Sequence, residues 1–361
     1  MASRHEVISS MLHGQLMQSE YVQNLVSVIV PTYNRARTLV EALDSVYAQT
    51  YRPVELIVID DGSTDDTGMI VEAWFRERQG DNQFELRYHW QENSGAPAAR
   101  NKGLVLSRGE YILFLDSDDV LYPNMLAEVV KAFEETRCDY VHVGYDKICC
   151  ECGRVIYSYT PEVEINPLTA YMRGNLWGHT TTFIRRRGLV QDIGPWDEAR
   201  LIDQDGDYMV RTILQSPNMA VVPEKLFSYR MQSGCRINDL RGSREAWECR
   251  LQREAMFCKG IRGGGDLSLG ATGIYAERLY ELAVGLTGSG MSDIGDSFGV
   301  LAGGFQDVEL GWRGKLLKYI WKSGKLACQS YVKARKAKKR LRQLFAARDV
   351  GEKSVCPVCG G

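Results

Sequence analysis

Three carboxylates stand within four consecutive positions, because Asp116, Ser117, Asp118 and Asp119 directly follow the apolar run 111–115. Five apolar residues in a row predict a strand buried on both faces, as in the interior of a parallel sheet. Carboxylates at the end of such a strand repel one another and lose hydration. A divalent cation removes that cost, because Mg²⁺ and Mn²⁺ prefer hard oxygen ligands. An acidic turn is the alternative interpretation, since aspartate is common in turns.

Two other predicted strands also end on polar side chains. Strand 26–31 ends at Pro31 and is followed by Thr32 and Tyr33. Strand 56–59 is followed by Asp60 and Asp61. Open parallel sheets bind ligands beyond the carboxyl ends of their strands. Turn chemistry alone does not explain three such strand ends, so we expect them to line one crevice.

Helical and extended patterns alternate between these strand ends. Apolar residues recur at helical spacing over 39–47 and over 70–75, and residues 84–90 predict a further strand. This alternation predicts a parallel sheet with right-handed crossovers. A dinucleotide-binding fold is excluded, because it needs Gly-x-Gly-x-x-Gly after the first strand and residues 31–36 contain no glycine.

Four motifs follow one another along this part of the chain: residues 28–34, 58–65, 93–103 and 114–119. In this order they make residues 25–235 resemble a family 2 glycosyltransferase of the GT-A fold. The resemblance implies an α/β fold with a mixed, mainly parallel, Rossmann-like sheet flanked by helices, extended here by C-terminal helices. It also implies transfer of a sugar, with inversion, from a nucleotide-diphosphate donor to a glycan or lipid-linked acceptor, as in polysaccharide and cell-envelope synthesis.

The resemblance assigns the nucleotide to the first two strand ends. Thr32 and Tyr33, after Pro31, would border the nucleotide, with the tyrosine ring facing the base. Asp61, or else Asp60, would accept a hydrogen bond from the uracil N–H of a UDP-sugar. Arg100 would lie against the base or the phosphates, a helix-surface arginine being the alternative.

The resemblance assigns the metal to the third strand end. Asp116 and Asp118 match the family's metal-binding pair, with Ser117 between them at the donor and Asp119 as a substitute ligand. The implied cofactor is Mn²⁺ or Mg²⁺, which would bridge the donor phosphates and neutralise charge on the leaving nucleotide.

The acceptor side lies further along the chain. The family usually carries Glu-Asp with an arginine six residues beyond the aspartate, so counting back from Arg211 selects Asp205 as general base, with Asp203 and Asp207 as fallbacks. Such a base takes the proton of the acceptor hydroxyl. An acidic helix start that suits the helix dipole is the alternative.

Trp177 and His179 match the acceptor region of the family, where Trp177 would stack on a sugar ring unless it only packs. Gln204 replaces the usual glutamate, and Gln232 replaces a histidine that often follows the Tyr-Arg ending. These departures favour the alternative of a catalytically impaired nucleotide-sugar-binding or scaffold protein of the same fold. Retention of every metal and base carboxylate favours the enzyme. A nucleotidyltransferase is disfavoured, because the first loop is not rich in glycine and basic residues.

We expect four segments: a lead-in over 1–24, the GT-A domain over 25–238, a glycine-rich helical extension over 239–310, and a basic helical tail over 311–361. Residues 311–345 contain eight lysines, four arginines and no acid, although the whole chain has a net charge of −2. Trp312, Leu316, Leu317, Ile320 and Trp321 recur on one helical face among these lysines. The pattern predicts contact with an anionic membrane surface, and a solvated basic helix is the alternative. No nucleic-acid partner is expected, because no nucleic-acid fold is recognised.

The N-terminal residues lack the unbroken apolar core of a secretory signal, and no run reaches the roughly 18 apolar residues of a spanning helix. We therefore expect a cytoplasmic protein, peripheral at the inner face of the membrane, with mostly reduced cysteines. Cys149 and Cys152, with Cys356 and Cys359, form two Cys-x-x-Cys-Gly motifs. A shared zinc is the less favoured interpretation, because the two motifs are too far apart for a spacing argument.

Overall fold

The protein, seen here in a computed structural model, divides into two compact units. The first consists of Met1–Ile165 and Trp177–Ser233, and the second of Asn166–Leu176 and Gly234–Gly361. The structure describes residues 10–11, 14–15, 21–78, 80, 82–163, 166–176, 179–200, 202–231, 242–262, 269–305 and 310–346.

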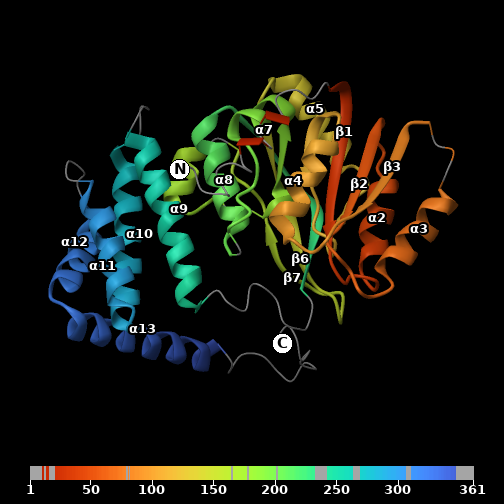
Figure 1. Ribbon diagram of the computed structural model, residues 1–361. Helices are drawn as coiled ribbons and strands as arrows, with labels where there is room; N and C mark the ends of the chain where they lie inside the picture. Colours follow the sequence, from red (N-terminus) through yellow and green to blue (C-terminus); the bar gives the residue numbers. More distant parts are fainter. Residues whose placement is uncertain are drawn as a thin grey trace. The chain divides into compact units, whose positions relative to one another are not determined.

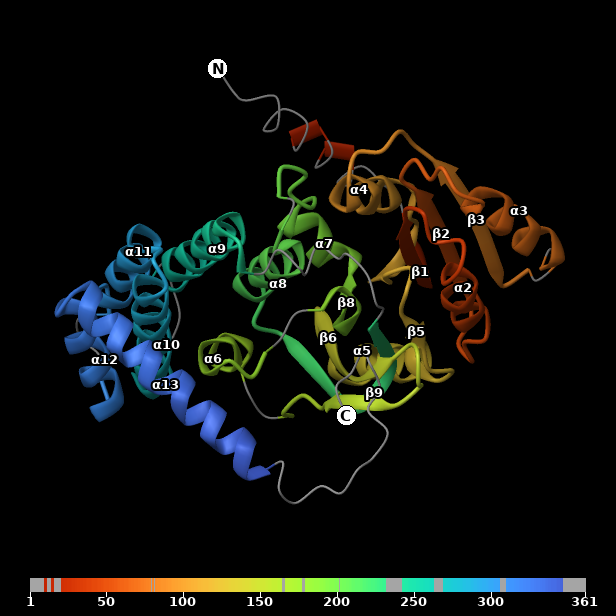
Figure 2. The ribbon, with the colours of Figure 1, turned by 90° about the horizontal axis from the view of Figure 1, so that it is seen from below.

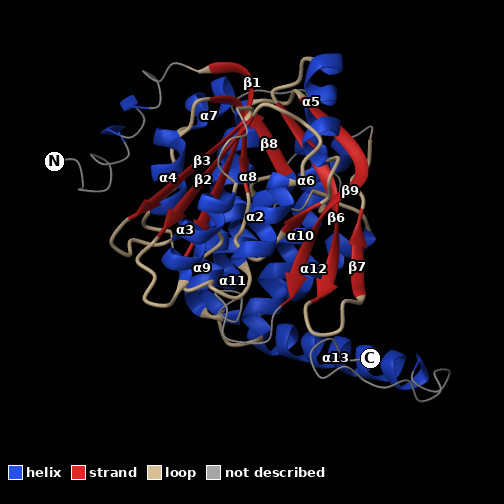
Figure 3. Ribbon diagram, turned by 90° about the vertical axis from the view of Figure 1, so that its right-hand side faces the viewer, coloured by secondary structure: helices blue, strands red, loops and turns tan. Residues whose placement is uncertain are grey.

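A nine-stranded mixed sheet forms the centre of the first unit (Figures 1 and 3). Its strands are β1 (Val22–Thr32), β2 (Val54–Asp60), β3 (Phe84–Trp90), β4 (Gly109–Phe114), β5 (Val120–Leu121), β6 (Tyr140–Cys149), β7 (Val155–Tyr159), β8 (Phe183–Arg186) and β9 (Met219–Met231). The connecting helices are α2 (Leu39–Tyr47), α3 (Thr67–Glu77), α4 (Ala96–Leu106), α5 (Met125–Thr136), the 3₁₀ turn η1 (Thr180–Thr182), α7 (Arg187–Ile193) and α8 (Gln204–Gln215).

The strand order is β3-β2-β1-β4-β8-β6-β9-β5, and β7 pairs with β6. β1 runs parallel to β2 and β4, and β2 runs parallel to β3. β8 is antiparallel to both β4 and β6. The predicted α/β fold class with a mixed sheet is therefore confirmed. Because β1, β2 and β4 are parallel, their carboxyl ends lie at one edge of the sheet, where Thr32 is the register partner of Asp60.

Apolar layers cover both faces of the parallel part of the sheet. Val28 and Val30 pack in a core with α2, α3 and α5, whereas Ile29 packs with residues of α4, α7 and α8. β4 shows the same alternation, since Leu113 faces the first layer and Ile112 and Phe114 the second. Figure 2 shows α2 and α3 on one side of β1–β3 and α4 on the other. The apolar runs of these strands follow from this two-sided burial.

A buried carboxylate, Glu55, fixes the strand register at the amino ends of the strands. Its Oε1 accepts hydrogen bonds from Ser27 Oγ at 2.5 Å and from the Gly109 amide at 3.0 Å, and its Oε2 accepts from Arg87 Nη2 at 2.9 Å. A side chain at position 109 is excluded, because a Cβ there would lie 2.6 Å from the carbonyl oxygen of Leu25. Glu55 thereby ties β1, β2, β3 and β4 together.

The second unit consists of helices in its described part: α6 (Pro167–Arg173), α9 (Arg244–Arg262), α10 (Leu269–Gly288), α11 (Ser292–Gly303), α12 (Trp312–Lys322) and α13 (Lys325–Ala346). Figure 2 shows α13 running beside α10 and α12. The buried Glu254 of α9 accepts hydrogen bonds from Tyr171 of α6 and Tyr275 of α10, at 3.0 and 2.5 Å. α6 is therefore built into this unit through a polar contact as well as through packing.

Glycines in this unit allow close helix packing. A Cβ at Gly288 of α10 would lie 2.8 Å from the carbonyl oxygen of Cys328 in α13. A Cβ at Gly299 of α11 would overlap the ring of Trp321 in α12. The high glycine content of the extension is therefore explained at these positions by helix contact, where a side chain would force the helices apart.

Glu55→Gln is expected to lower the free energy of unfolding by about 3 kcal/mol, because it leaves Arg87 without its buried charge partner. Urea denaturation measures this change. Glu85→Gln is the matched control, because Glu85 contacts the same Arg87 from a side chain that is 47% exposed. The control should cost less than about 1 kcal/mol. Equal effects of the two substitutions would contradict the role given to Glu55.

Candidate active site

An ion pair at the carboxyl edge of the sheet joins α4 to the end of β4. Arg100 Nη2 of α4 lies 2.9 Å from Asp116 Oδ1, two residues after β4. The other branch of the same guanidinium donates a 3.0 Å hydrogen bond to Gln204 Oε1, at the start of α8. Three predicted site residues, far apart in sequence, are thus in direct contact.

The acidic turn after β4 carries more negative charge than Arg100 offsets. Burial alone would raise the pKa of Asp116, but Arg100 and His179 outweigh it and hold the pKa below its usual value. Burial, together with the charges of Asp116 and Asp118, raises the pKa of Asp119 well above its usual value. An added positive charge would therefore be stabilised here.

Asp116, Asp119 and His179 form a group that fits a divalent cation. One ligand atom from each lies within 4.8 Å of those of the other two. Two carboxylates and an imidazole are a donor set that Mn²⁺ accepts. Asp118 is not part of this group among the described residues, and its backbone oxygen accepts a 2.5 Å hydrogen bond from Arg230 Nε. Its role as a ligand stays a prediction.

The predicted nucleotide residues lie at the ends of β1 and β2. Pro31 and Thr32 are buried, whereas the Tyr33 ring is 47% exposed. The Asp61 amide donates a 2.8 Å hydrogen bond to the carbonyl oxygen of Thr32, which joins the two strand ends beyond the ladder. Asp60 accepts hydrogen bonds from the Ser63 amide and from Tyr88 Oη, both at 2.8 Å.

Asp61 holds the start of α4. Its Oδ1 accepts from Gln91 Nε2 at 2.7 Å and from the Ser94 amide at 2.9 Å, while Oδ2 accepts from the Gly95 amide at 2.8 Å. A carboxylate at a helix start satisfies amides that have no intrahelical partner. Asp61 thereby fixes the helix that carries Arg100.

The two candidate bases on α8 have different surroundings. Asp205 is partly exposed and accepts a 2.5 Å hydrogen bond from Thr180 Oγ1. Asp207 is buried between two arginines, with Arg211 Nε at 3.0 Å and Arg200 Nη2 at 3.5 Å. Asp205 is therefore the more accessible of the two carboxylates, and the arginines of these ion pairs contact Asp207 instead.

Other predicted residues have mixed outcomes. Ser117 is buried in the acidic turn. His179 lies at the carboxylates, beside Tyr229, and the centroids of the two rings are 4.5 Å apart.

Trp177 lies outside the described residues, as do Gln232, Cys356 and Cys359, so the shared zinc is untested there. Cys149 and Cys152 lie at the hairpin turn between β6 and β7.

Thr180 and Tyr229 were not singled out by the sequence, although both contact predicted site residues. Their position next to a candidate residue, in His179-Thr180 and in Tyr229-Arg230, was the available signal.

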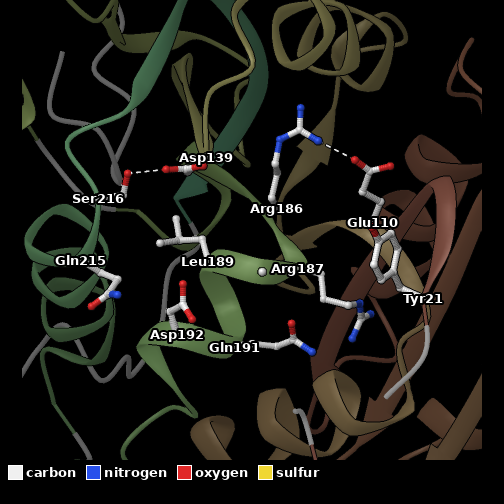
Figure 4. A pocket seen from close by; sticks show the side chains of 11 residues that line it. Tyr21, Glu110, Asp139, Arg186, Arg187, Leu189, Gln191, Asp192, Gln215 and Ser216 are labelled. Carbon is white, nitrogen blue, oxygen red and sulfur yellow. Dashed lines mark hydrogen bonds and ion pairs between the residues drawn. The ribbon is translucent and has the colours of Figure 1, made fainter. Parts of the chain in front are cut away.

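A pocket of about 420 Å³ lies at the other edge of the sheet, near the amino ends of β4 and β6. Two pairs of its polar side chains contact each other, since Arg186 points toward Glu110 and Ser216 toward Asp139 (Figure 4). The side chains that line this hollow include none of the residues that the sequence predicts for the site, so it is not the candidate active site.

Comparisons with known proteins find similarity to glycosyltransferases. Residues 27–191 match the model of glycosyl transferase family 2. The glycosyltransferase GlyG of Streptococcus pneumoniae is 28% identical over 225 residues, which cover 59% of this chain and 73% of GlyG. An uncharacterized glycosyltransferase of Rickettsia felis is 40% identical over 133 residues, 37% of this chain and 21% of that protein. Residues 27–191 are therefore similar to glycosyl transferase family 2, and the chain spans about a fifth of the length of the Rickettsia felis relative.

Two solved structures share the fold. The S. aureus TarS fragment 1–349, in complex with UDP-GlcNAc, has a TM-score of 0.63 at 21% identity, covering 88% of this chain and 91% of the fragment. The mannosyltransferase PcManGT from Pyrobaculum calidifontis, in complex with GDP-Man and Mn²⁺, has a TM-score of 0.52 at 17% identity, covering 91% and 95%. These likenesses establish the GT-A fold of the chain.

Arg100→Gln is expected to lower the free energy of unfolding by about 3 kcal/mol, because it leaves the Asp116 carboxylate without its ion-pair partner. Urea denaturation without added metal measures the loss. Gln204→Glu is the matched control, because it keeps an oxygen acceptor opposite Arg100, and should change stability by less than about 1 kcal/mol. A negligible effect of Arg100→Gln would show that the ion pair does not stabilise the site.

Proposed function

We propose that the protein transfers a sugar from a UDP-sugar to a glycan or lipid-linked acceptor, with inversion, a divalent cation and Asp205 as general base. The observation that carries this proposal is the contact of Arg100 with both Asp116 and Gln204. It brings the predicted donor side and the predicted base side of the reaction to one edge of the sheet. The nucleotide-sugars named for the two structural neighbours support a donor of this class.

The ends of β1 and β2 would hold the nucleotide. The exposed ring of Tyr33 offers a face to the base, and Thr32 Oγ1 is buried without a hydrogen-bond partner, so it is available to a ligand. Asp61 already accepts three hydrogen bonds from its own chain. A carboxylate has about four lone-pair sites, so one acceptor position is left for a uracil N–H.

The acidic turn would hold the cation through Asp116 and Asp119, with Asp118 next to them. A cation bound there supplies positive charge that stabilises the diphosphate leaving group. Arg100 keeps Asp116 oriented from the side of α4, and its positively charged guanidinium would also offset the charge of the donor phosphates.

Asp205 is the proposed base because its carboxylate is accessible and lies in the first turn of α8. It would take the proton of the acceptor hydroxyl as the oxygen attacks the anomeric carbon, and the nucleoside diphosphate would leave from the opposite face. Thr180 Oγ1 donates to one carboxylate oxygen, which leaves the other to the acceptor. Asp207 is the poorer base, because both of its carboxylate oxygens already contact arginines, Oδ1 with Arg200 and Oδ2 with Arg211.

Asp205→Asn is expected to lower kcat by at least about 100-fold, since it removes the proton acceptor while keeping shape. The measurement is UDP release from UDP-sugars with Mn²⁺, starting with UDP-GlcNAc. Nucleotide binding should be unchanged in this variant. Asp207→Asn is the comparison, and its main effect should be on stability because it leaves two arginines without a partner. An unchanged kcat of Asp205→Asn would overturn the proposed base.

We propose further that the second unit contacts an anionic membrane surface. Leu317 is buried and Trp321 packs on Gly299, so part of the predicted apolar face is used within the unit. Among the side chains that the structure describes on α12 and α13, the large apolar ones that remain exposed are Leu316, Tyr319 and Leu326, at 44%, 70% and 79%. The exposed lysines 315, 322 and 325 adjoin them on α12 and α13. Apolar side chains among lysines suit the headgroup layer of anionic lipid.

No helix in the described part of the chain has the length and apolar character needed to cross a membrane. Contact would therefore rest on the surface patch of Leu316, Tyr319 and Leu326 with its lysines. A lipid-linked acceptor would be reached at such a surface.

The full chain is expected to float with vesicles that contain phosphatidylglycerol and not with vesicles of phosphatidylcholine alone. Replacing Tyr319 and Leu326 by glutamate should abolish flotation, because charge replaces apolar contact and weakens the attraction to anionic lipid. Arg76→Glu on α3, an exposed basic residue of the first unit, is the matched control. Undiminished binding of the Tyr319/Leu326 variant, or equal binding to both vesicles, would refute the proposed surface.

A further inference from the structure

An imidazole faces the two carboxylates of the acidic turn. His179 Nε2 lies 3.8 Å from Asp116 Oδ2, and its Nδ1 lies 3.6 Å from Asp119 Oδ2. Both distances are too long for a direct hydrogen bond. The sequence assigned His179 to the acceptor, and it assigned the metal to carboxylates alone.

We infer that His179 is a nitrogen ligand of the cation, and that this ligand makes the site prefer Mn²⁺ over Mg²⁺. The inference rests on the proposed function, in which the acidic turn holds a divalent cation. It changes the ligand set from carboxylates only to Asp116, Asp119 and His179.

One nitrogen of the imidazole is buried without a hydrogen-bond partner. This nitrogen is Nδ1, and the His179 side chain is only 17% exposed. A buried polar nitrogen without a partner costs about 1–3 kcal/mol. A cation held between this ring and the carboxylates would satisfy one of the two nitrogens.

Packing and backbone contacts hold the ring in place. Thr182 Oγ1 accepts from the His179 amide at 3.2 Å and donates to the His179 carbonyl oxygen at 2.6 Å. The rings of Tyr229 and Phe227 lie against the imidazole, with centroid distances of 4.5 and 5.9 Å. The side chain is thus positioned before any ligand arrives, which lowers the entropic cost of binding.

The chemistry of the ligands decides the preferred metal. Mg²⁺ favours oxygen ligands and gives up water reluctantly, whereas imidazole suits transition metals. The Asp119 carboxylate, which supplies an oxygen ligand, is held in place by hydrogen bonds from the Arg230 amide at 3.3 Å and from Thr181 Oγ1 at 3.4 Å. One nitrogen among oxygens therefore favours Mn²⁺ without excluding Mg²⁺.

The test is a titration of the full chain with Mn²⁺, in which the electron paramagnetic resonance signal of free Mn²⁺ reports binding and added Mg²⁺ competes. It is run with and without UDP. His179→Asn is expected to raise the Kd for Mn²⁺ at least about tenfold. His179→Asp, which returns an oxygen ligand, should move the ratio of the two Kd values toward Mg²⁺. His89→Asn is the matched control and should leave both Kd values unchanged.

A pulsed measurement on the wild-type chain avoids reliance on a variant that fails to fold. Electron spin echo modulation from a ¹⁴N nucleus on bound Mn²⁺ is expected if the imidazole coordinates the metal. Absence of this modulation, or an unchanged Mn²⁺ Kd in folded His179→Asn, overturns the inference and leaves the cation of the proposed function in place. Failure of the wild-type chain to bind either metal, with or without UDP, overturns both.

Discussion

One guanidinium connects the segments that meet at the carboxyl edge of the sheet. Arg100 contacts Asp116 after β4 and Gln204 at the start of α8, and its own helix is fixed by the Asp61 carboxylate at the end of β2. Residues that are more than a hundred positions apart are held in one arrangement by this chain of contacts. The arrangement depends on charge balance, because Arg100 pairs with Asp116 and Arg230 contacts Asp118 and Asp119 in the same acidic turn.

The remaining charge explains why the turn after β4 is suited to a further cation. Asp119 is fully buried near Asp116 and Asp118, and its pKa is raised well above its usual value by burial and by these neighbours. Buried carboxylates that are not fully neutralised cost free energy, and a bound cation lowers that cost. The same imbalance is absent around Asp207, where two arginines surround one carboxylate.

Much of the first unit could be predicted from local sequence, because its strands are buried on both faces and its helices are amphipathic. The predicted strand 84–90 and helix 39–47 agree with β3 and α2 to the residue. The apolar run before Asp116 was correctly interpreted as a strand covered on both sides. The spacing of apolar residues involves only residues close together in the chain, so it can be recognised in a single sequence.

The site was predictable only in part, because contacts between distant segments leave no local pattern. Asp116 and Arg100 could be named from their motifs, but their ion pair could not. The approach of His179 to Asp119 depends on how η1 and β8 return to the sheet between β4 and β6. Likewise, nothing in the sequence distinguishes Asp205 from Asp207 by their surroundings, which only the positions of Arg200 and Arg211 reveal.

The helical unit includes a segment that interrupts the sheet unit in sequence. α6 is joined by Glu254 and by Arg278, whose Nη1 donates to the carbonyl oxygens of Tyr171 and Met172 at 2.6 and 2.8 Å. The polypeptide passes between the units three times, and one passage lies just before His179. A fragment ending after β9 would therefore still contain α6 but neither Glu254 nor Arg278, and α6 would lose the hydrogen bonds that join it to α9 and α10.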